Sequence, residues 1–431
     1  MKKISLLAFF AALVMTANAT DLWTGSKHVT WDDGGVQIAS SAFTDAQAGQ
    51  KIVVHFTGAS DGIEFKVMNT PYFDHLAGSR EAAWISGDGT FEQFLTANAV
   101  DSLKAHGLEI IGANFNVSKV ELLDGKTLKG GISVWTGFFW ADNWKTLELY
   151  GNGYKYVDFS KMNALRIYSE AGRSDFTINI KENWDAEGQI ADMSMMTAGD
   201  GYMELPLTAA LRTRLSAAGH WMIQFNKDAG AAFNVTDIVL VSGEMEVSAA
   251  GYATYYNSAE AYRMPNGMEG YVFNTTDGLV KEYESGKVVP AGTALILHAA
   301  AGKYPFVFAT GGTAPSATNQ LLGTDTVSTL PADASAYFYG LSLNGANDAD
   351  SVGLYWMNAT GEAFTNGAHK AYLKVAKSSA PARYYLFNGE NGATGIRELQ
   401  EGEKACKFLE NGQIYILKDG HVYDVTGRVV K

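Results

Sequence analysis

The chain has 431 residues, of which 47% are hydrophobic and 18% are charged, and its formal net charge is −13. That charge argues against a nucleic-acid partner, because a phosphate backbone attracts a basic surface. The single cysteine, Cys406, excludes an intramolecular disulfide and a metal cluster held by several thiolates. At about 100–200 residues per domain, the length predicts two to four domains.

The first 19 residues have the pattern of a signal peptide. Lys2 and Lys3 precede an apolar stretch at 4–15, and a small-x-small motif follows at 17–19. The apolar stretch is too short for a hydrocarbon core of about 30 Å, and no later stretch has the length and apolarity to cross one. We therefore expect a signal peptide at 1–19 and an exported protein with no transmembrane segment, which is secreted, periplasmic or held at the outer cell surface.

An internal repeat follows the signal peptide. The Trp-Thr-Gly sequence at 23–25 recurs at 135–137, and the Phe-Asn-Val sequence at 115–117 recurs at 233–235. Second tryptophans follow the two Trp-Thr-Gly blocks, at Trp31 and Trp144. Similar blocks in the same order indicate a duplicated domain of about 110 residues, longer than the repeats of solenoids.

Each copy is predicted to consist of short strands and one helix. Alternating hydrophobicity predicts strands at 36–38, 51–56, 63–67, 145–150, 164–168 and 176–180. Helical spacing at 96–106 and 208–218 ends at Gly107 and Gly219, and glycine is typical just after a helix. This pattern predicts an all-β fold with two tandem β-sandwich (jelly-roll) domains, at 20–126 and 127–245.

The order of these blocks resembles galactose-binding-like jelly-roll domains, which are similar to carbohydrate-binding modules. The likeness includes the Trp-x-Gly sequence, the second tryptophan, the helix and a Gly-Leu-x-Ile-x-Gly sequence at 107–112. It covers 21–125 and, more weakly, 130–243, because the second copy has Gly-His-Trp-Met-Ile-Gln at 219–224. Such modules accompany glycan-degrading proteins exported by Gram-negative gut bacteria, and the resemblance identifies the fold better than the ligand.

The second half is predicted to be a further all-β domain at 246–388, followed by a short β-meander at 389–431. The domain looks like the C-terminal β-domains of such exported proteins. Asn-Gly at 411–412 and Asp-Gly at 419–420 are typical of the tight turns of a meander. Residues 423–430 look like part of a type IX secretion sorting domain, but further strands follow this motif in that family. Attachment to the outer surface through the tail and a plain hairpin cap are both left open.

Signals of catalysis are weak. The sequence Gly-Ala-Ser-Asp-Gly at 58–62 matches a nucleophile elbow, but strands flank it on both sides, so we expect a hairpin loop. The histidines lack a zinc-ligand spacing, and the chain has no phosphate-binding loop. The paired carboxylates of a glycosidase cannot be found by spacing. An enzyme is therefore disfavoured, and no cofactor is expected.

Two acidic loops contain the oxygen ligands that calcium accepts. They lie at 32–35 and 344–350. Both lack the further ligands of an established calcium loop, which favours polar surface turns over a structural calcium site.

Aromatic residues in polar stretches are the candidate carbohydrate-binding residues. Sugars pack their C–H faces on aromatic rings while their hydroxyls bond to polar neighbours. The candidates are Trp84 with Arg80, and Trp140 and Trp144 with Asp142 and Asn143. We expect Trp84 and Trp140 to be exposed. Each copy has a tryptophan at this position of the Trp-Thr-Gly block, Trp23 in the first and Trp135 in the second, so these two are expected to anchor the cores.

These observations favour an exported, non-catalytic protein that binds a polysaccharide or another glycan through loop aromatics of the tandem sandwiches. A structural or adhesin-like surface protein with spacer modules is the alternative. A glycoside hydrolase, or an accessory module of one, is the third hypothesis.

Overall fold

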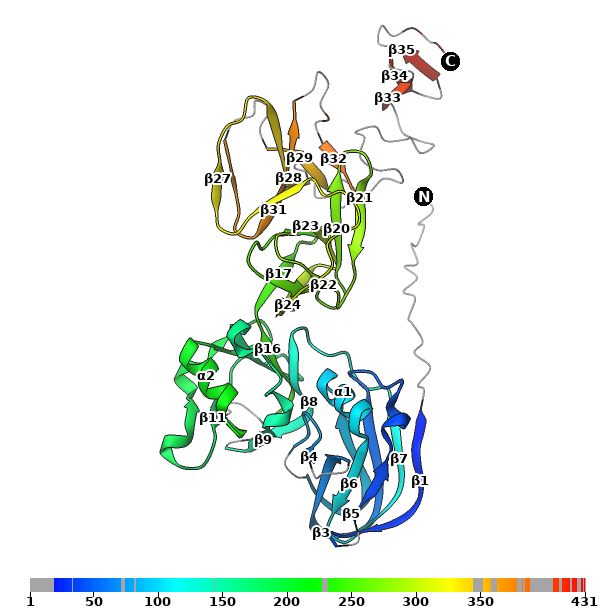
Figure 1. The fold of residues 1–431 in the computed structure, drawn as a ribbon, viewed down its shortest axis with the longest axis vertical. Coiled ribbons are helices and arrows are strands. Elements are labelled where there is room, and N and C mark those ends of the chain that lie inside the picture. The colour runs from blue at the N-terminus through cyan, green and yellow to red at the C-terminus, as the bar shows by residue number, and fades with distance from the viewer. Residues whose placement is uncertain are drawn as a thin grey trace, which may run out of the picture. The chain divides into compact units, whose positions relative to one another are not determined.

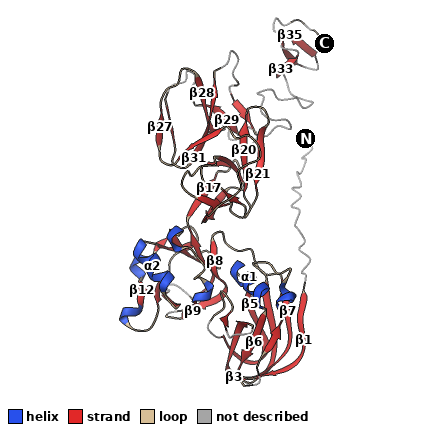
Figure 2. Ribbon diagram, in the orientation of Figure 1, coloured by secondary structure: helices blue, strands red, loops and turns tan. Residues whose placement is uncertain are grey.

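Strands form most of the regular structure, and the all-β prediction is confirmed (Figure 2). The computed structural model describes residues 19–32, 34–70, 74–80, 83–142, 144–226, 232–343, 352–357, 363–377, 382, 384–387, 406–410, 413–418, 421–424, 428 and 430. The chain divides into two units, Met1–Ser242 and Gly243–Lys431. The predicted signal peptide lies outside the described residues, apart from Ala19.

The first β-sandwich of unit one is built around one long strand. Its elements are β1 (Thr20–Val29), β2 (Val36–Ile38), β3 (Lys51–Asn69), β4 (Asp74–His75), β5 (Ala83–Phe94), α1 (Ala97–His106), β6 (Leu108–Gly112) and β7 (Phe115–Leu123). β5 pairs with both halves of β3, whereas β7 pairs with the first half and β6 with the second (Figure 1). Both layers of the sandwich therefore share β3. Phe65 and Phe115, which are fully buried, belong to the core between them.

The prediction of a hairpin loop at 58–62 is wrong, because these residues lie inside β3. Gly58 and Gly62 have positive φ angles of 69° and 68°, and the register with β5 shifts on either side of Ala59. Such bulges bend a strand without ending it. Alternating apolar residues on both sides of the bend explain why the strand continues into the second layer.

In the second β-sandwich, separate strands follow the course that the single strand β3 takes in the first. Its elements are β8 (Ile132–Ala141), β9 (Thr146–Tyr150), β10 (Ala164–Ser169), β11 (Thr177–Lys181), β12 (Gln189–Ala191), β13 (Thr197–Ala198), β14 (Tyr202–Pro206), α2 (Ala209–Ala217), β15 (His220–Asn226) and β16 (Phe233–Val241). One sheet has the order β13-β14-β10-β16-β8, and the other has the order β12-β11-β15-β9.

The pairing of the first and last strands is the same in both sandwiches. Trp23 lies opposite Val120, and Trp135 lies opposite Ile238. Register shifts occur just before and just after the tryptophan in both pairs of strands. A β-carbon added at Gly25 would lie 2.9 Å from Cζ2 of Trp23, and one at Gly137 would lie 2.8 Å from Cζ2 of Trp135. A side chain at either glycine would therefore press against the indole that covers it.

Both predicted helices are present, and each begins at a threonine cap. The hydroxyl oxygen of Thr96 accepts a hydrogen bond from the backbone N–H of Ala99, and that of Thr208 accepts one from Leu211. Such side-chain caps satisfy N–H groups that have no partner inside the helix. One helix thus accompanies each sandwich, as the sequence predicts.

Side-chain and backbone contacts join the two sandwiches within unit one. The His75 ring stacks on Tyr150 with 4.0 Å between centroids, and Nδ2 of Asn98 donates to the carbonyl of Asn152 at 2.9 Å. A β-carbon at Gly153 would lie 3.2 Å from the backbone nitrogen of Gly78. The close approach of these backbones indicates a packed junction.

Unit two contains several smaller antiparallel sheets. Its strands are β17 (Gly243–Val247), β18 (Tyr252–Tyr255), β19 (Ala261–Arg263), β20 (Glu269–Asn274), β21 (Gly278–Tyr283), β22 (Val288–Val289), β23 (Leu295–His298), β24 (Gly302–Phe306), β25 (Phe308–Ala309), β26 (Leu321–Thr324), β27 (Ser328–Leu330), β28 (Ala336–Ser342), β29 (Gly353–Trp356), β30 (Phe364–Asn366), β31 (Lys370–Ala376) and β32 (Tyr384–Leu386). One sheet has the order β18-β23-β20-β21, and another has the order β26-β31-β28-β29-β32. Separate buried clusters form its cores.

The predicted meander is present in the tail. Its strands are β33 (Cys406–Glu410), β34 (Gln413–Lys418) and β35 (His421–Asp424), which form one antiparallel sheet in that order. The predicted turn dipeptides at 411–412 and 419–420 lie outside the described residues.

Candidate functional site

The outer face of the second half of β3 carries an ion pair. Phe65 and Val67 are buried in the core, so the alternation of a strand turns Glu64 and Lys66 outward. Nζ of Lys66 lies 3.0 Å from Oε1 of Glu64, and the two side chains are 22% and 31% exposed, respectively. The charged groups thus stand at the solvent side of the sheet.

Trp84 lies beside this ion pair. In the register of β3 and β5 it is directly opposite Glu64. Opposite residues of an antiparallel pair share a face, with β-carbons about 4.5–5.5 Å apart. Because Ala83 and Ile85 are buried, Trp84 points outward, and it is 67% exposed. The predicted exposure of Trp84 is confirmed.

The turn after β1 brings a second tryptophan to the same face. Trp31 is 41% exposed, and Nζ of Lys66 lies 5.8 Å from the centroid of its ring. This distance is within the range of a cation–π contact. Trp31, Glu64, Lys66 and Trp84 therefore form one continuous surface, which we call the tryptophan platform.

Further hydrogen-bonding groups follow the platform along β5. Oγ of Ser86, the next outward residue after Trp84, donates to Oδ1 of Asp61 at 2.7 Å. Oγ of Ser86 also accepts a hydrogen bond from the backbone N–H of Gly62 at 2.9 Å. The bend in β3 therefore supplies a polar edge next to Trp84.

The platform suits a ligand with an apolar face and hydroxylated edges. The exposed indoles can pack against C–H groups. The carboxylate of Glu64 accepts hydrogen bonds, while the ammonium of Lys66 donates them. Because the two charges offset each other, the platform has no net formal charge and favours a neutral ligand.

Trp31, Glu64 and Lys66 are not among the candidate residues that the sequence predicts. The predicted strand at 63–67 already places Glu64 and Lys66 on its outer face, so alternation was the available signal. The contact of Lys66 with the Trp31 ring depends on long-range packing, which no local pattern contains.

Arg80 lies in the junction between the two sandwiches. Its backbone forms a β-bridge with Leu149, and its guanidinium carbon lies 5.3 Å from the centroid of the Phe139 ring. Burial lowers the pKa of Arg80, and the charge of Glu148 opposes that shift. The guanidinium thus contacts the second sandwich.

Trp140 is 53% exposed on β8, so the predicted exposure is confirmed. It lies opposite Asn234 on β16, and Nδ2 of Asn234 donates to Oε2 of Glu170 at 2.9 Å. The polar neighbours that the pairing gives Trp140 thus come from β16 and from the turn after β10. Asn234 and Glu170 are not among the candidate residues that the sequence predicts.

The remaining candidate residues form the turn between β8 and β9. The carbonyl of Asp142 accepts a hydrogen bond from the N–H of Lys145 at 3.1 Å. Trp144 is 49% exposed and has a positive φ of 63°. Asn143 lies outside the described residues.

The described residues contain neither a candidate metal centre nor a helix that could span a membrane. Among the described residues, no group of three or more His, Cys, Asp or Glu side chains is placed to hold a metal ion. The acidic loop at 344–350 and Asp33 lie outside the described residues, so the calcium hypothesis stays a prediction. In the same described part of the chain, no helix is long and apolar enough to span a membrane.

No family model matches the chain, and no curated protein matches it either. Among solved structures, the chain is similar to a Bacteroides ovatus protein, SGBP-B of a mixed-linkage glucan utilization locus, in complex with a mixed-linkage heptasaccharide. The two share 20% identity with a TM-score of 0.22, and the match covers 24% of this chain and 30% of that one. A likeness of this extent leaves the function to be argued from the site itself.

Proposed function

We propose that the chain is an exported, non-catalytic glycan-binding protein and that the tryptophan platform holds its polysaccharide. The observation that carries the proposal is the pair of exposed rings, Trp31 and Trp84, on either side of the Glu64–Lys66 ion pair. The signal-peptide pattern at 1–19 supports export.

The charge of the protein and of the platform narrows the glycan class. The net charge of −13 disfavours a polyanionic polymer, which the chain would repel. The offset charges of Glu64 and Lys66 fit neutral hydroxyls, which both donate and accept hydrogen bonds. The proposed partner is therefore a neutral polysaccharide.

The surface around Trp140, with Asn234 and Glu170, is proposed as a second, weaker contact with the same polymer. It has one exposed ring and one bonded polar pair, whereas the platform has two rings. Two contacts on one polymer chain raise the apparent affinity if the polymer can reach both.

Affinity electrophoresis of the full chain in gels that contain plant or host polysaccharides tests the proposal. A neutral polymer should retard the protein, and Trp84→Ala should weaken binding by about 1–3 kcal/mol, the range measured for ring stacking on bases. Trp184→Ala is the matched control, because Trp184 is 62% exposed and lies outside the platform. Lack of retardation in every gel would favour the spacer hypothesis, and equal effects of the two variants would exclude the platform as the site.

A further inference from the structure

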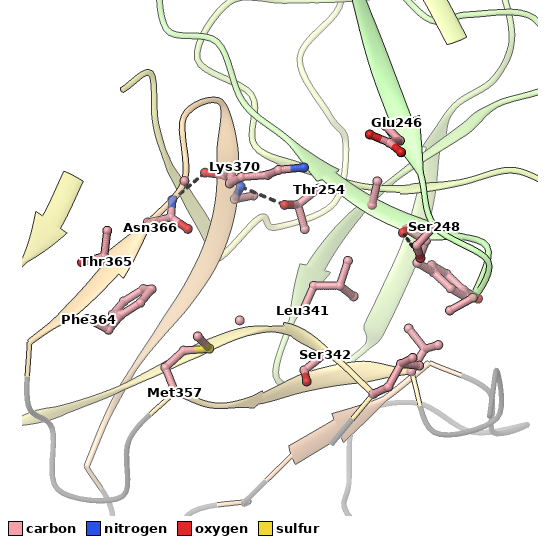
Figure 3. A pocket seen from close by; sticks show the side chains of 18 residues that line it. Glu246, Ser248, Thr254, Leu341, Ser342, Met357, Phe364, Thr365, Asn366 and Lys370 are labelled. Atoms are coloured by element: carbon pink, nitrogen blue, oxygen red, sulfur yellow. Dashed lines mark hydrogen bonds between the residues drawn. The ribbon is translucent and has the colours of Figure 1, made fainter. Parts of the chain in front are cut away.

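A pocket in unit two lies apart from the tryptophan platform. It has a volume of about 530 Å³ and is lined by β17 and β18 on one side and by residues of β28, β30 and β31 on the other (Figure 3). Pockets for small molecules are typically about 300–1,000 Å³. The pocket is therefore large enough for a small organic ligand.

Apolar side chains form one wall of the pocket. This part is lined by Leu341 on β28, Met357 just after β29 and Phe364 on β30, which Figure 3 labels around the pocket. A β-carbon at Gly340 would lie 2.5 Å from Sδ of Met357. Glycine at this position thus allows the thioether to lie close against β28, and the wall depends on that contact.

Polar groups line the rest of the pocket and can bond to a ligand. Met245 and Val247 are buried, so Glu246 between them turns away from their core and lines the pocket with Lys370. In the described part of the chain, neither charged group takes part in an ion pair. Their charges are available to a ligand.

Asn366 adds an acceptor. Its Nδ2 donates to the carbonyl of Lys370 at 2.8 Å and to Oγ1 of Thr324 at 2.9 Å. Both amide hydrogens are thus used, which leaves Oδ1 as an acceptor. The side chain is held in place, since Asn366 is only 7% exposed. Its amide is therefore a fixed part of the pocket.

We propose that this pocket binds a small polyhydroxylated ligand, a single sugar or the end of a short oligosaccharide. Hydroxyl groups can donate to Glu246 and to Oδ1 of Asn366 and can accept from Lys370, because each is both a donor and an acceptor. The C–H face of the sugar packs on the apolar wall. A free amino acid would also match the two charges, so amino acids serve as competitors in the test. The proposal does not rest on the function of the platform.

Saturation-transfer NMR and titration calorimetry on the full chain test this proposal. The probes are glucose, galactose, mannose, xylose and N-acetylglucosamine, oligosaccharides of two and three of these units, and glycine and leucine as competitors. At least one sugar should bind. Lys370→Met should weaken it about tenfold or more, and Leu341→Trp should abolish binding by filling the cavity. Lys104→Met, at an exposed lysine of α1, controls for the loss of one positive charge.

The outcomes separate the two proposed sites. Trp84→Ala should leave sugar binding in the pocket unchanged, whereas Lys370→Met should leave retardation by polysaccharide unchanged. Glu246→Gln and Lys370→Met change rim side chains, so they provide the test if Leu341→Trp does not fold. The proposal is overturned if no sugar binds, if only the amino acids bind, or if both rim variants bind the sugar as tightly as the native chain.

Discussion

Trp23 and Trp135 occupy the same register position in two β-sandwiches whose outer faces differ. In the first sandwich, Glu121 follows the Trp23 partner on β7 and bonds to Lys119 and His55 at the surface. In the second, the residue after the Trp135 partner on β16 is Val239, which is fully buried. The inward positions are alike, whereas the outward positions have become charged in one sandwich and apolar in the other.

The segment between the sandwiches accounts for part of this difference. Nζ of Lys126 lies 3.2 Å from Oδ2 of Asp237, and Nζ of Lys129 lies 5.1 Å from the centroid of the Tyr168 ring. A β-carbon at Gly131 would lie 2.6 Å from Cγ1 of Val239. The connecting segment therefore covers a face of the second sandwich, and the equivalent face of the first carries surface ion pairs.

The sheet that contains the second half of β3 also differs from the sheet that contains β11 in the second sandwich. This difference concerns the proposed function. Glu64 and Lys66 occupy outward positions of β3, but β11 has Thr177 and Asn179 next to its buried Ile178. Oδ1 of Asn179 accepts from Nε2 of Gln189 at 3.1 Å. Inward residues thus fix the fold, while a few outward residues give each copy a different surface.

The largest expected effect tests the shared core. Phe115 and Phe233 are 0% and 6% exposed, and Phe233 packs on Phe176 with 4.6 Å between centroids. Replacing either ring by Ala should cost about 3–5 kcal/mol, because the cavity is surrounded by other packed side chains. Urea unfolding of the full chain measures both losses. A loss below about 1 kcal/mol in either variant would break the equivalence of the two positions.

The second prediction contrasts a buried and an exposed charge at corresponding positions. Asp237 is 2% exposed, and its carboxylate accepts from Thr136 and Lys126. Asp237→Asn should cost about 3 kcal/mol, since it leaves the ammonium of Lys126 without its counter-charge. Lys119→Met breaks only surface ion pairs and should cost about 0–1 kcal/mol. If Asp237→Asn and Lys119→Met lowered the free energy of unfolding in urea equally, the connecting segment would not shield Asp237.

The features of the fold that could be predicted from the sequence are local or recur along the chain. Alternation at 63–67, the threonine-capped helices and the two Trp-Thr-Gly blocks predicted strands, helices and the sandwiches, because these features are local or recur. The course of β3 through 58–62 could not be predicted, because glycines at a bulge resemble glycines at a turn.

The site was predictable only in part. The exposure of Trp84 and Trp140 followed from their polar surroundings. The partners did not, because the pairing of Trp84 with Glu64 and of Trp140 with Asn234 joins residues far apart in the chain. Arg80 shows the same limit, since a polar stretch in the sequence became part of the junction with Phe139.

A third prediction concerns the Trp-Thr-Gly blocks. Alanine at Gly137 would press on Trp135, which is 3% exposed and surrounded by core residues, so the substitution should cost about 1–3 kcal/mol. Alanine at Gly25 meets Trp23, which is only partly buried and can move outward, so its cost should stay below about 1 kcal/mol. Thermal unfolding of both variants compares the costs. A larger loss for Gly25→Ala would reverse the assigned burial of the two indoles.

The smallest expected effect concerns the loss of stability at acidic pH. We expect a contribution from Glu121 in the first sandwich and none from the corresponding position of the second. Hydrogen bonds, first from Lys119 and then from His55, lower the pKa of Glu121 below its ordinary value of 4.5. A carboxyl whose pKa is lower in the folded state stabilises the fold above its unfolded pKa, and this contribution is lost as the pH falls through the folded value. Val239 has no titratable group.

Glu121→Gln should therefore lower the melting temperature slightly near neutral pH and make it fall less steeply between about pH 5 and about pH 3. Val239→Ala, at the corresponding position, should lower the melting temperature equally across that range, because it removes packing and no titratable group. Glu92→Gln on β5, which breaks the exposed pair with Lys51, controls for the loss of a surface carboxylate. If the native chain and Glu121→Gln lose stability with the same slope, the network around Glu121 makes no contribution, and the charged face distinguishes the first sandwich in composition alone.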